Sequence, residues 1–373
     1  MPVKADRFIA ERLRFKGRLA TVAVTVSFFV IVISLAIAGG FRREIRSGIA
    51  GVSGDIMLSE SEPVIELDSA VLAHLESVRG ISSVTPVIWK PGIVKGADDI
   101  CGVLVKGVPM SDSCSLQARI PELLARRMKL GPGDAMTTYF VDEKVKARRF
   151  TVAEVYQGIL DTDQAMVVQV PLADMQRLCG MDGSEAGALE VRVNPEYSDG
   201  ARLKVKADEL SWIARMRSST MQERYPQLFD WLSLIDFNVV AILLLMTIVA
   251  GFNMISGLLI LLFRNISTIG MLKSMGMGNR GIARVFLRVS ARIVLTGMLI
   301  GNAAALLFCL VQGSTHLLKL NPANYFVSFV PVHVNVPLVL GVDALAFGAI
   351  MLLLLIPTLF IAKVDPAETV RVK

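Results

Sequence analysis

Few side chains of this 373-residue chain stand in a pattern that could do chemistry. Asp161 and Asp163, in the segment GILDTDQAM, are close enough to suggest a carboxylate pair for general acid–base catalysis. Two carboxylates in a loop are more often a solvated turn, so we expect no catalysis there. The histidines, His74, His316 and His333, lie far apart and in no catalytic or metal-binding spacing.

Motifs for nucleotide binding and hydrolysis are also missing from the sequence. It contains no G-x-x-x-x-G-K-[ST] phosphate loop, no G-x-S-x-G and no H-E-x-x-H, and GPGD at residues 131–134 reads as a turn. We therefore expect no catalytic residue, no metal site and no cofactor bound by this chain. If the protein performs work, a partner must supply the energy.

The four cysteines do not indicate a disulfide framework. Cys309 lies in an apolar run, and Cys101, Cys114 and Cys179 are odd in number. The spacing of Cys101 and Cys114 carries no signature, and the sequence leaves open whether these two are bridged.

Long uncharged runs dominate the sequence, which is 53% hydrophobic with a mean hydropathy of +0.56. A helix needs about 20 apolar residues to cross a bilayer. Four runs meet this length, and we predict transmembrane helices at residues 19–41, 237–263, 293–318 and 344–362. The alternative for the first run is a cleaved signal peptide, but the run exceeds the roughly 7–15-residue apolar core of such peptides. A retained anchor is therefore favoured.

The distribution of Lys and Arg predicts the orientation in the membrane. Residues 1–18 hold six basic and two acidic side chains, and residues 264–292 hold six basic and none acidic. Residues 42–236, in contrast, hold 23 basic and 28 acidic side chains. We therefore expect the segments 1–18, 264–292 and 363–373 in the cytoplasm, and 42–236 and 319–343 on the outer side.

Residues 42–236 mix predicted strands with short helices, which is typical of an α+β domain. Helices are predicted at 68–78, where Val71, Leu72, Leu75 and Val78 share one face, and within 120–130, 171–180 and 202–229. Residues 41–49 extend the first span as a polar helix. Strands are predicted at 81–89, 101–108 and 188–195, and as a pair joined by a charged turn within 135–156.

The segment RNISTIGMLKSMGMGNRGIARVF, residues 264–286, is a polar interruption between two spans. Within it, Ile266, Ile269, Leu272 and Met275 recur every three residues and predict a short helix with one apolar stripe. The glycines of GMGNRG end this helix, and a second helix begins near Asn279. The short helix is either an interfacial helix held by lipid phosphates or a docking element for a cytoplasmic partner.

These segments resemble, in order and over nearly the whole chain, the FtsX-type permeases of type VII (MacB-like) ABC transporters. FNMIS at 252–256 and IGMLKSMG at 269–276 match the pattern between the second and third spans of that family. YPQLFDWLSLIDFNVV, NYFVSFVPVHVN and VDPAETVR resemble its LolC/LolE lipoprotein-releasing branch. ARIPELLARRMKLGPGD and YQGILDTDQAMVVQVPLADMQRL resemble the MacB periplasmic core domain.

The resemblance implies a membrane α-helical fold with four transmembrane helices and a large periplasmic α+β core domain between helices 1 and 2. It implies a non-catalytic permease subunit of the bacterial inner membrane, paired with a second permease copy or a paralogue. ATP and Mg would be bound by a separate LolD-like ABC ATPase dimer. The coupling helix that contacts this ATPase would comprise Ser267, Thr268, Ile269, Gly270, Leu272, Lys273, Ser274, Met275 and Gly276.

The resemblance further implies ATP-driven extraction of lipoproteins or similar amphiphiles from the membrane, with no role for nucleic acid. Candidate contacts with acyl chains, each also explained as ordinary helix packing, are Phe28, Phe29, Ile33, Ile37, Phe41, Leu243, Met246 and Phe252. Alternatives are MacB-like efflux, FtsX-like signalling to a cell-wall hydrolase, and a sensor or adhesion protein without an ATPase. Gly297-x-x-x-Gly301 fits close helix packing and is a weak dimerisation signal.

Two departures from the family pattern affect the expected partners. Relatives begin the loop with acidic residues, where this chain has Arg264, Ile266 and Thr268, so we expect a dedicated ATPase partner. LolC-type subunits carry a long Pro-containing hook for a soluble lipoprotein carrier, where this chain has only VDEKVKARR. We therefore do not expect carrier docking through a hook.

Overall fold

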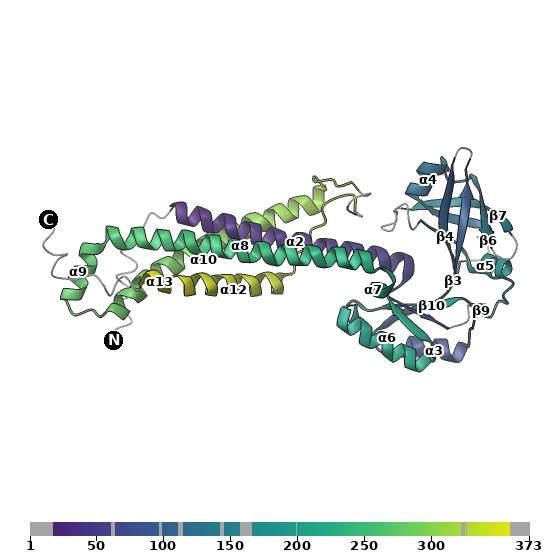
Figure 1. Cartoon of the computed structure of the whole chain (residues 1–373), viewed down its shortest axis with the longest axis horizontal. Helices are drawn as coiled ribbons and strands as arrows, with labels where there is room; N and C mark the ends of the chain where they lie inside the picture. The colour runs from purple at the N-terminus through teal and green to yellow at the C-terminus, as the bar shows by residue number, and fades with distance from the viewer. Residues whose placement is uncertain are drawn as a thin grey trace. The chain divides into compact units, whose positions relative to one another are not determined.

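The computed structural model describes residues 18–60, 64–96, 99–110, 115–141, 145–156, 166–198, 200–321, 325 and 327–358. The chain forms two compact units, coloured along the sequence in Figure 1. The first comprises residues 1–42, 232–319 and 329–373 and is built from helices. The second comprises residues 43–231 and 320–328 and contains the sheets.

The helices of the first unit are long because their sequences are almost free of charge and helix breakers. They are α2 (Arg18–Ser53), α8 (Pro226–Arg264), α9 (Ile266–Ser274), α10 (Asn279–Thr315), α12 (Val336–Leu353) and α13 (Leu355–Thr358). Four segments are long and apolar enough to cross a membrane, as predicted, at residues 18–49, 226–264, 279–315 and 336–358. Helix α2 continues past the predicted end of the first span, because Ile45, Ile49 and Val52 are buried along one side of its extension.

The fourth long helix begins earlier than predicted. Asn335 caps it by accepting a hydrogen bond from the Leu338 amide, and Pro337 occupies its first turn. Asp343, expected in the preceding loop, is therefore inside α12, where its side chain is buried. The expectation placed the helix start after the last charged residue, whereas burial against neighbouring helices lets this one carry a carboxyl group. Residues 359–362 lie outside the described residues.

Close packing of α10 on α2 explains the pair of glycines four residues apart. A Cβ atom on Gly297 would lie 2.8 Å from Val24 Cγ1, and one on Gly301 would lie 2.5 Å from the backbone oxygen of Thr25. The two glycines thus bring helices of the same chain together, and Phe28 packs over Gly301. These small residues therefore allow close helix packing within a single chain.

The second unit is organised by a nine-stranded sheet with the order β11-β1-β10-β3-β4-β8-β5-β7-β6. The strands are β1 (Ile56–Ser59), β3 (Ile81–Lys95), β4 (Ile100–Val108), β5 (Gln117–Pro121), β6 (Ala135–Val141), β7 (Val145–Tyr156), β8 (Val167–Pro171), β10 (Ala188–Val193) and β11 (Arg217–Thr220). The pairs β4–β8 and β5–β7 are parallel, and β2 (Ile65–Glu66) pairs separately with β9 (Glu185–Ala186). This mixed architecture confirms the predicted α+β class.

Strand β3 links two parts of the sheet. Its first half pairs with β10 and its second half with β4. Around the second half, α4 (Glu122–Met128) and α5 (Leu172–Cys179) complete a core that includes Phe140 and Phe150. The first half lies in the part that contains α3 (Ser69–Ser77), the 3-10 helix η2 (Pro195–Tyr197) and α6 (Gly200–Ala214).

The helix predicted over residues 202–229 is interrupted at residues 215–220, whereas residues 202–214, 221–224 and 226–229 are helical. Helix α6 ends at Ala214, Arg215 adopts a left-handed backbone conformation, and β11 follows as a partner of β1. A capping box between Thr220 and Glu223 then starts α7 (Met221–Arg224). Pairing with β1, which is remote in sequence, replaces the local helical preference. The helix predicted at 68–78 is confirmed, with Asp68 as its N-cap.

Substituting Gly301 by Ala should destabilise the bundle by about 1–3 kcal/mol, because the new methyl group must displace α2 backbone. Gly348→Ala is the matched control, since a Cβ atom there meets nothing within 4 Å. Thermal unfolding of both purified full-length variants in detergent measures the difference. Equal midpoints for the two variants would contradict the packing described for α10 and α2.

Candidate functional site

Helix α9 occupies the loop between α8 and α10, at one end of the bundle (Figure 1). The Asn265 side chain donates to the Leu261 oxygen at the end of α8. At the other end, the Gly276 amide donates to Lys273 O and the Met277 amide donates to Leu272 O, both at 2.9 Å. This Schellman pattern requires the left-handed φ of +87° at Gly276. The predicted turn and the start of α10 at Asn279 are confirmed.

The two sides of α9 differ in burial. Ile269 and Gly270 are buried, and Ile269 belongs to the bundle core against which Leu272 packs. Met271 and Met275, one turn apart, are 61% and 78% exposed. The prediction that Met275 shares the apolar face of Ile269 is therefore wrong. Steps of three residues drift by about 60° each around a helix, so four such positions cannot all face one side.

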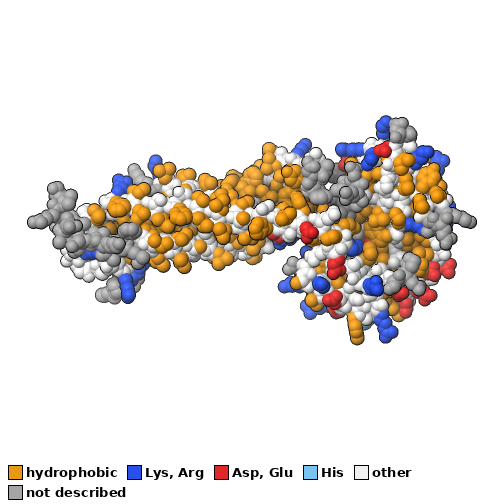
Figure 2. All heavy atoms as spheres, viewed as in Figure 1, with side chains coloured by type: hydrophobic (Ala, Val, Ile, Leu, Met, Phe, Trp, Pro, Cys, Tyr) orange, Lys and Arg blue, Asp and Glu red, His pale blue; other side chains and the backbone are white. Residues whose placement is uncertain are grey.

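We call Ser267, Met271, Ser274 and Met275 the exposed face of α9; all four are exposed. The face carries no charge, while Arg264, Arg280 and Arg284 are exposed around it. Basic side chains are visible near this end of the helices in Figure 2. Methionine side chains are flexible and polarisable, so they adapt well to a partner surface. The geometry suits a docking element flanked by positive charge.

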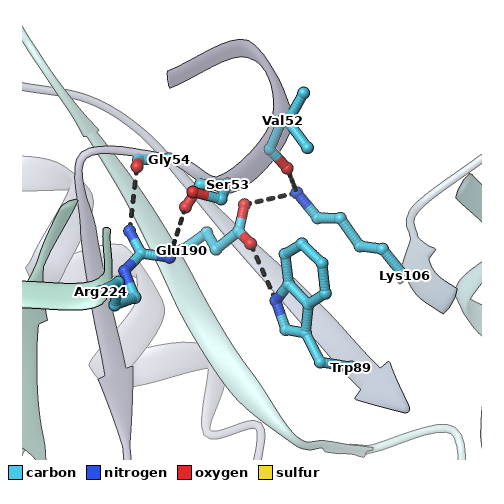
Figure 3. A network of polar contacts seen from close by, with 7 residues as sticks. All are labelled: Val52, Ser53, Gly54, Trp89, Lys106, Glu190 and Arg224. Carbon is cyan, nitrogen blue, oxygen red and sulfur yellow. Dashed lines mark hydrogen bonds and ion pairs between the residues drawn. The ribbon is translucent and has the colours of Figure 1, made fainter. Parts of the chain in front are cut away.

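A second candidate site lies where α2 ends inside the second unit (Figure 3). The last carbonyl groups of a helix have no partner within the helix. Lys106 Nζ donates to Val52 O at 2.5 Å. Arg224 donates to Ser53 O at 2.9 Å and to Gly54 O at 3.0 Å. Two cations from different elements thus satisfy the end of α2, where the helix dipole also favours positive charge.

The cation on Lys106 is balanced within the same network. Glu190 Oε2 lies 2.6 Å from Lys106 Nζ, and Trp89 Nε1 donates to Glu190 Oε1 at 3.1 Å. Lys106 and Glu190 side chains are only 5% and 6% exposed. Burial lowers the pKa of the Lys106 ammonium group, and Glu190 opposes that shift. The network therefore joins the end of α2 to β4, β10, β3 and α7.

The sequence contained a signal for this network that the analysis of hydrophobic periodicity did not detect. Lys106 interrupts the apolar strand CGVLVKGV, and Glu190 interrupts ALEVRV. A charged residue among apolar neighbours in a buried strand needs a partner of opposite charge. The pairing itself depends on strand order, which brings β4 and β10 to either side of β3.

The predicted acyl-chain contacts fall into different environments. Phe28 and Phe41 are buried within the chain, which leaves them little surface for a lipid. Phe252 is 63% exposed on α8. The remaining five are half-buried: Phe29, Ile33, Ile37, Leu243 and Met246. Figure 2 shows many hydrophobic side chains on the surface of the first unit, as expected for helices that contact lipid or other helices.

The second unit also contains an open groove of about 1130 Å³ beside α6. Trp212, at its edge, is 85% exposed. The groove is lined by Glu60, His74, Asp208, Ser211, Trp212, Ile213, Arg215, Met216 and Arg217. Exposed aromatic residues beside a groove are typical of surfaces that bind proteins.

Within the described ranges, His, Cys, Asp and Glu form no group of three that could hold a metal ion. The carboxylates Asp161 and Asp163 lie outside the described residues, as does Cys114. Their predicted roles therefore stay predictions.

Comparison with known proteins finds similarity along nearly the whole chain. Residues 240–366 match the family model of the FtsX-like permease C-terminal domain. The chain is 22% identical over 406 residues to the lipoprotein-releasing system transmembrane protein LolC of Xylella fastidiosa strain 9a5c, covering 96% of this chain and 94% of that protein. It is 21% identical over 405 residues to LolE of Haemophilus influenzae, covering 94% and 93%.

Two solved structures are similar to part of the chain, at lower sequence identity. The periplasmic region of MacB from Actinobacillus actinomycetemcomitans is 16% identical with a TM-score of 0.32, covering 50% of this chain and 98% of that one. The extracellular domain of the noncanonic ABC-type transporter YknZ from Gram-positive bacteria is 12% identical with a TM-score of 0.30, covering 45% and 99%.

Removing one partner of the buried pair should be costly. Glu190→Gln leaves the Lys106 cation without its counter-charge and should lower the free energy of unfolding by about 3–5 kcal/mol. Urea unfolding followed by Trp fluorescence measures this loss. Glu122→Gln, which breaks an exposed pair with Arg126, is the control and should change little.

The double variant Lys106→Met with Glu190→Leu should lose less stability than Glu190→Gln, because no buried charge is left alone. It still removes the cap on Val52 O. A double variant less stable than the single one would contradict the assignment of the cost to an unpaired Lys106.

Proposed function

Because this chain is a type VII ABC transporter permease of the LolC/LolE branch, we propose that it couples ATP hydrolysis by a separate cytoplasmic ATPase to motion of its α+β domain. ATP and Mg belong to that partner, a LolD-like ATPase dimer, and not to this chain. The α+β domain lies in the periplasm and both termini lie in the cytoplasm. The observation that carries the proposal is the exposed face of α9, which is uncharged, centred on two methionines and flanked by arginines.

In this proposal α9 is the coupling helix, comprising Ser267 to Gly276. Ile269 and Leu272 hold it to the bundle core, so a force on its exposed face reaches α8 and α10. The exposed methionines would seat in a groove of the ATPase. The basic residues beside them would contact acidic residues of that partner, which fits a dedicated ATPase.

Helix α2 is the proposed mechanical link to the periplasmic domain. It is one continuous helix from Arg18 to Ser53, and its residues from Arg43 onward belong to the second unit. Lys106 and Arg224 hold its last carbonyl groups. Movement of α2 would therefore act on β4 and α7 directly. A rigid element fixed at its end can pass a displacement on without a substrate crossing the membrane.

We propose that the client is a lipoprotein or similar amphiphile in the outer leaflet of the inner membrane. Its acyl chains would contact α2 and α8 at Phe29, Ile33, Ile37, Leu243, Met246 and Phe252, none of which is fully buried. Only 11% of an 18-residue apolar stretch of α8 is buried, so this helix has surface for a second permease copy as well. Strands β6 and β7 are joined by only residues 142–144, which argues against a hook for a carrier.

The groove beside Trp212 favours a second candidate function. A periplasmic protein bound there would make the chain a signalling permease that regulates, for example, a cell-wall hydrolase. In that case no lipid-modified protein would co-purify with the complex.

Replacing Met271 and Met275 together by Glu should abolish co-purification of the ATPase, because two charges would be buried in its groove without partners. The measurement is affinity purification from membranes in mild detergent with mass spectrometry. Asn279→Glu, exposed at the start of α10, is the matched control and should retain the ATPase. An undiminished ATPase signal in the double variant would remove the coupling role of α9.

The same purification of the unaltered chain tests the client. A lipid-modified protein that is bound without ATP and lost with ATP is expected for lipoprotein release. Recovery of a cell-wall hydrolase without lipid-modified protein would favour the signalling function instead.

Single-cysteine labelling in a cysteine-free background tests the topology. Val145→Cys should react with an impermeant thiol reagent added to the periplasmic side, because Val145 is 65% exposed in the second unit. Gly278→Cys, exposed beside α9, should react only after the membrane is opened. The reverse pattern would invert the proposed orientation.

A further inference from the structure

Two polar side chains meet inside the apolar helices of the first unit. Asn302 of α10 donates through Nδ2 to Asp343 Oδ2 at 2.5 Å. Asp343 is 3% exposed and lies seven residues into α12, or about 10 Å along the helix axis. Its buried neighbours on the same helix, Val339 and Ala346, are apolar. A carboxyl group at this depth in a membrane helix is costly, and ionisable residues in such positions commonly mark functional sites.

This pair is incomplete as an interaction between an amide and a carboxylate. Asp343 Oδ1 and Asn302 Oδ1 are both buried and both have no hydrogen-bond partner. Each of these atoms can only accept in the ionised state of Asp343. A buried acceptor without a donor costs its full desolvation free energy. The site therefore has two acceptors that need a donor.

The surrounding helices provide no counter-charge in the parts that the structure describes. Arg292 of α10 lies ten residues before Asn302, and His316, the C-cap of α10, lies fourteen residues after it, about 15 and 21 Å along the helix axis. His333 precedes α12 and donates its backbone amide to Ala36 O. Residues 19–41 of α2, 237–263 of α8, α13 and the rest of α12 contain no charged residue.

We propose that Asp343 binds a proton within the membrane and forms a neutral acid–amide pair with Asn302. The proton comes from solvent and resides on Asp343 Oδ1, whose O–H donates to Asn302 Oδ1. Asn302 Nδ2 continues to donate to Asp343 Oδ2. One proton thus supplies the donor that both orphan oxygens lack, and it removes the charge from the bilayer.

A proton fits the site better than a metal ion does. Hard cations such as Ca²⁺ and Mg²⁺ take about six or more oxygen ligands. The site offers two unpartnered oxygens, and the described residues contain no larger group of metal-ligating side chains. Two oxygens are enough for one shared proton.

The pair makes the contact between α10 and α12 depend on that proton. Without it, a charge would lie in hydrocarbon and the two Oδ1 atoms would have no donor between them. Helix α10 also follows α9 directly after the Gly276 turn. Asp343 is thus a proton-binding site on α12, in contact with the helix α10 that the proposed coupling movement would displace. Its occupancy can be measured without any partner.

Infrared spectroscopy of the full-length chain in lipid nanodiscs at neutral pH tests the proposal. The difference spectrum between the unaltered chain and Asp343→Asn should show the carbonyl band of a protonated carboxylic acid, shifted in D₂O. Asp236→Asn is the matched control: this partly exposed carboxylate pairs with Arg42 and should contribute only carboxylate bands. A spectrum in which Asp343→Asn removes carboxylate bands instead would overturn the proposal.

Thermal unfolding of the same samples gives an independent readout. Asp343→Asn should keep its midpoint, because a carboxamide donates to Asn302 Oδ1 as the acid does. Asp343→Ala should lower the midpoint by roughly 5 °C, since it leaves the Asn302 amide unpaired. Asp343→Leu combined with Asn302→Leu should recover part of that loss. If Asp343→Asn is as unstable as Asp343→Ala, the ionised carboxylate is what the site needs and the proposal fails.

Discussion

The buried pair between Lys106 and Glu190 is the interaction on which the arrangement of the second unit depends. The end of α2 presents carbonyl groups that no helical partner can satisfy, and the ammonium group of Lys106 reaches one of them. That ammonium group can be buried only because Glu190 lies 2.6 Å away. Glu190 is in turn held by Trp89 from the neighbouring strand. Polar contacts thus connect the end of α2 with strands β3, β4 and β10, and Glu190 supplies the counter-charge.

The membrane imposes the same rule more strictly on the first unit. Hydrocarbon offers no water to satisfy a polar group, so helices must pack closely or pair their polar side chains with each other. Gly297 and Gly301 meet the first demand by bringing α10 against the backbone of α2. Asn302 and Asp343 meet the second, and with one added proton they meet it completely. The glycine packing and the Asn302–Asp343 pair both fix the position of α10, which is the helix that α9 would move.

Local sequence signals were sufficient wherever one segment determines its own structure. The four spans follow from apolar length, and the end of α9 follows from Gly276, which tolerates a left-handed backbone. They failed where a remote partner intervened. Residues 217–220 pair with β1 and interrupt the helix predicted there. The exposure of Met275 has a local cause instead, because steps of three residues drift around a helix and carry this position off the apolar side of α9.

The sequence by itself therefore determined the number of apolar helices, the α+β class of the second unit and the short helix in the loop, because length, charge and turn residues act over a few neighbouring positions. Only the tertiary structure decided which polar groups meet. Lys106 and Glu190 are 84 residues apart, and Asn302 and Asp343 are 41 apart. No local pattern connects such positions. Their pairing follows from strand order and helix packing, because the tertiary structure determines which partner lies within hydrogen-bonding distance of a buried polar group.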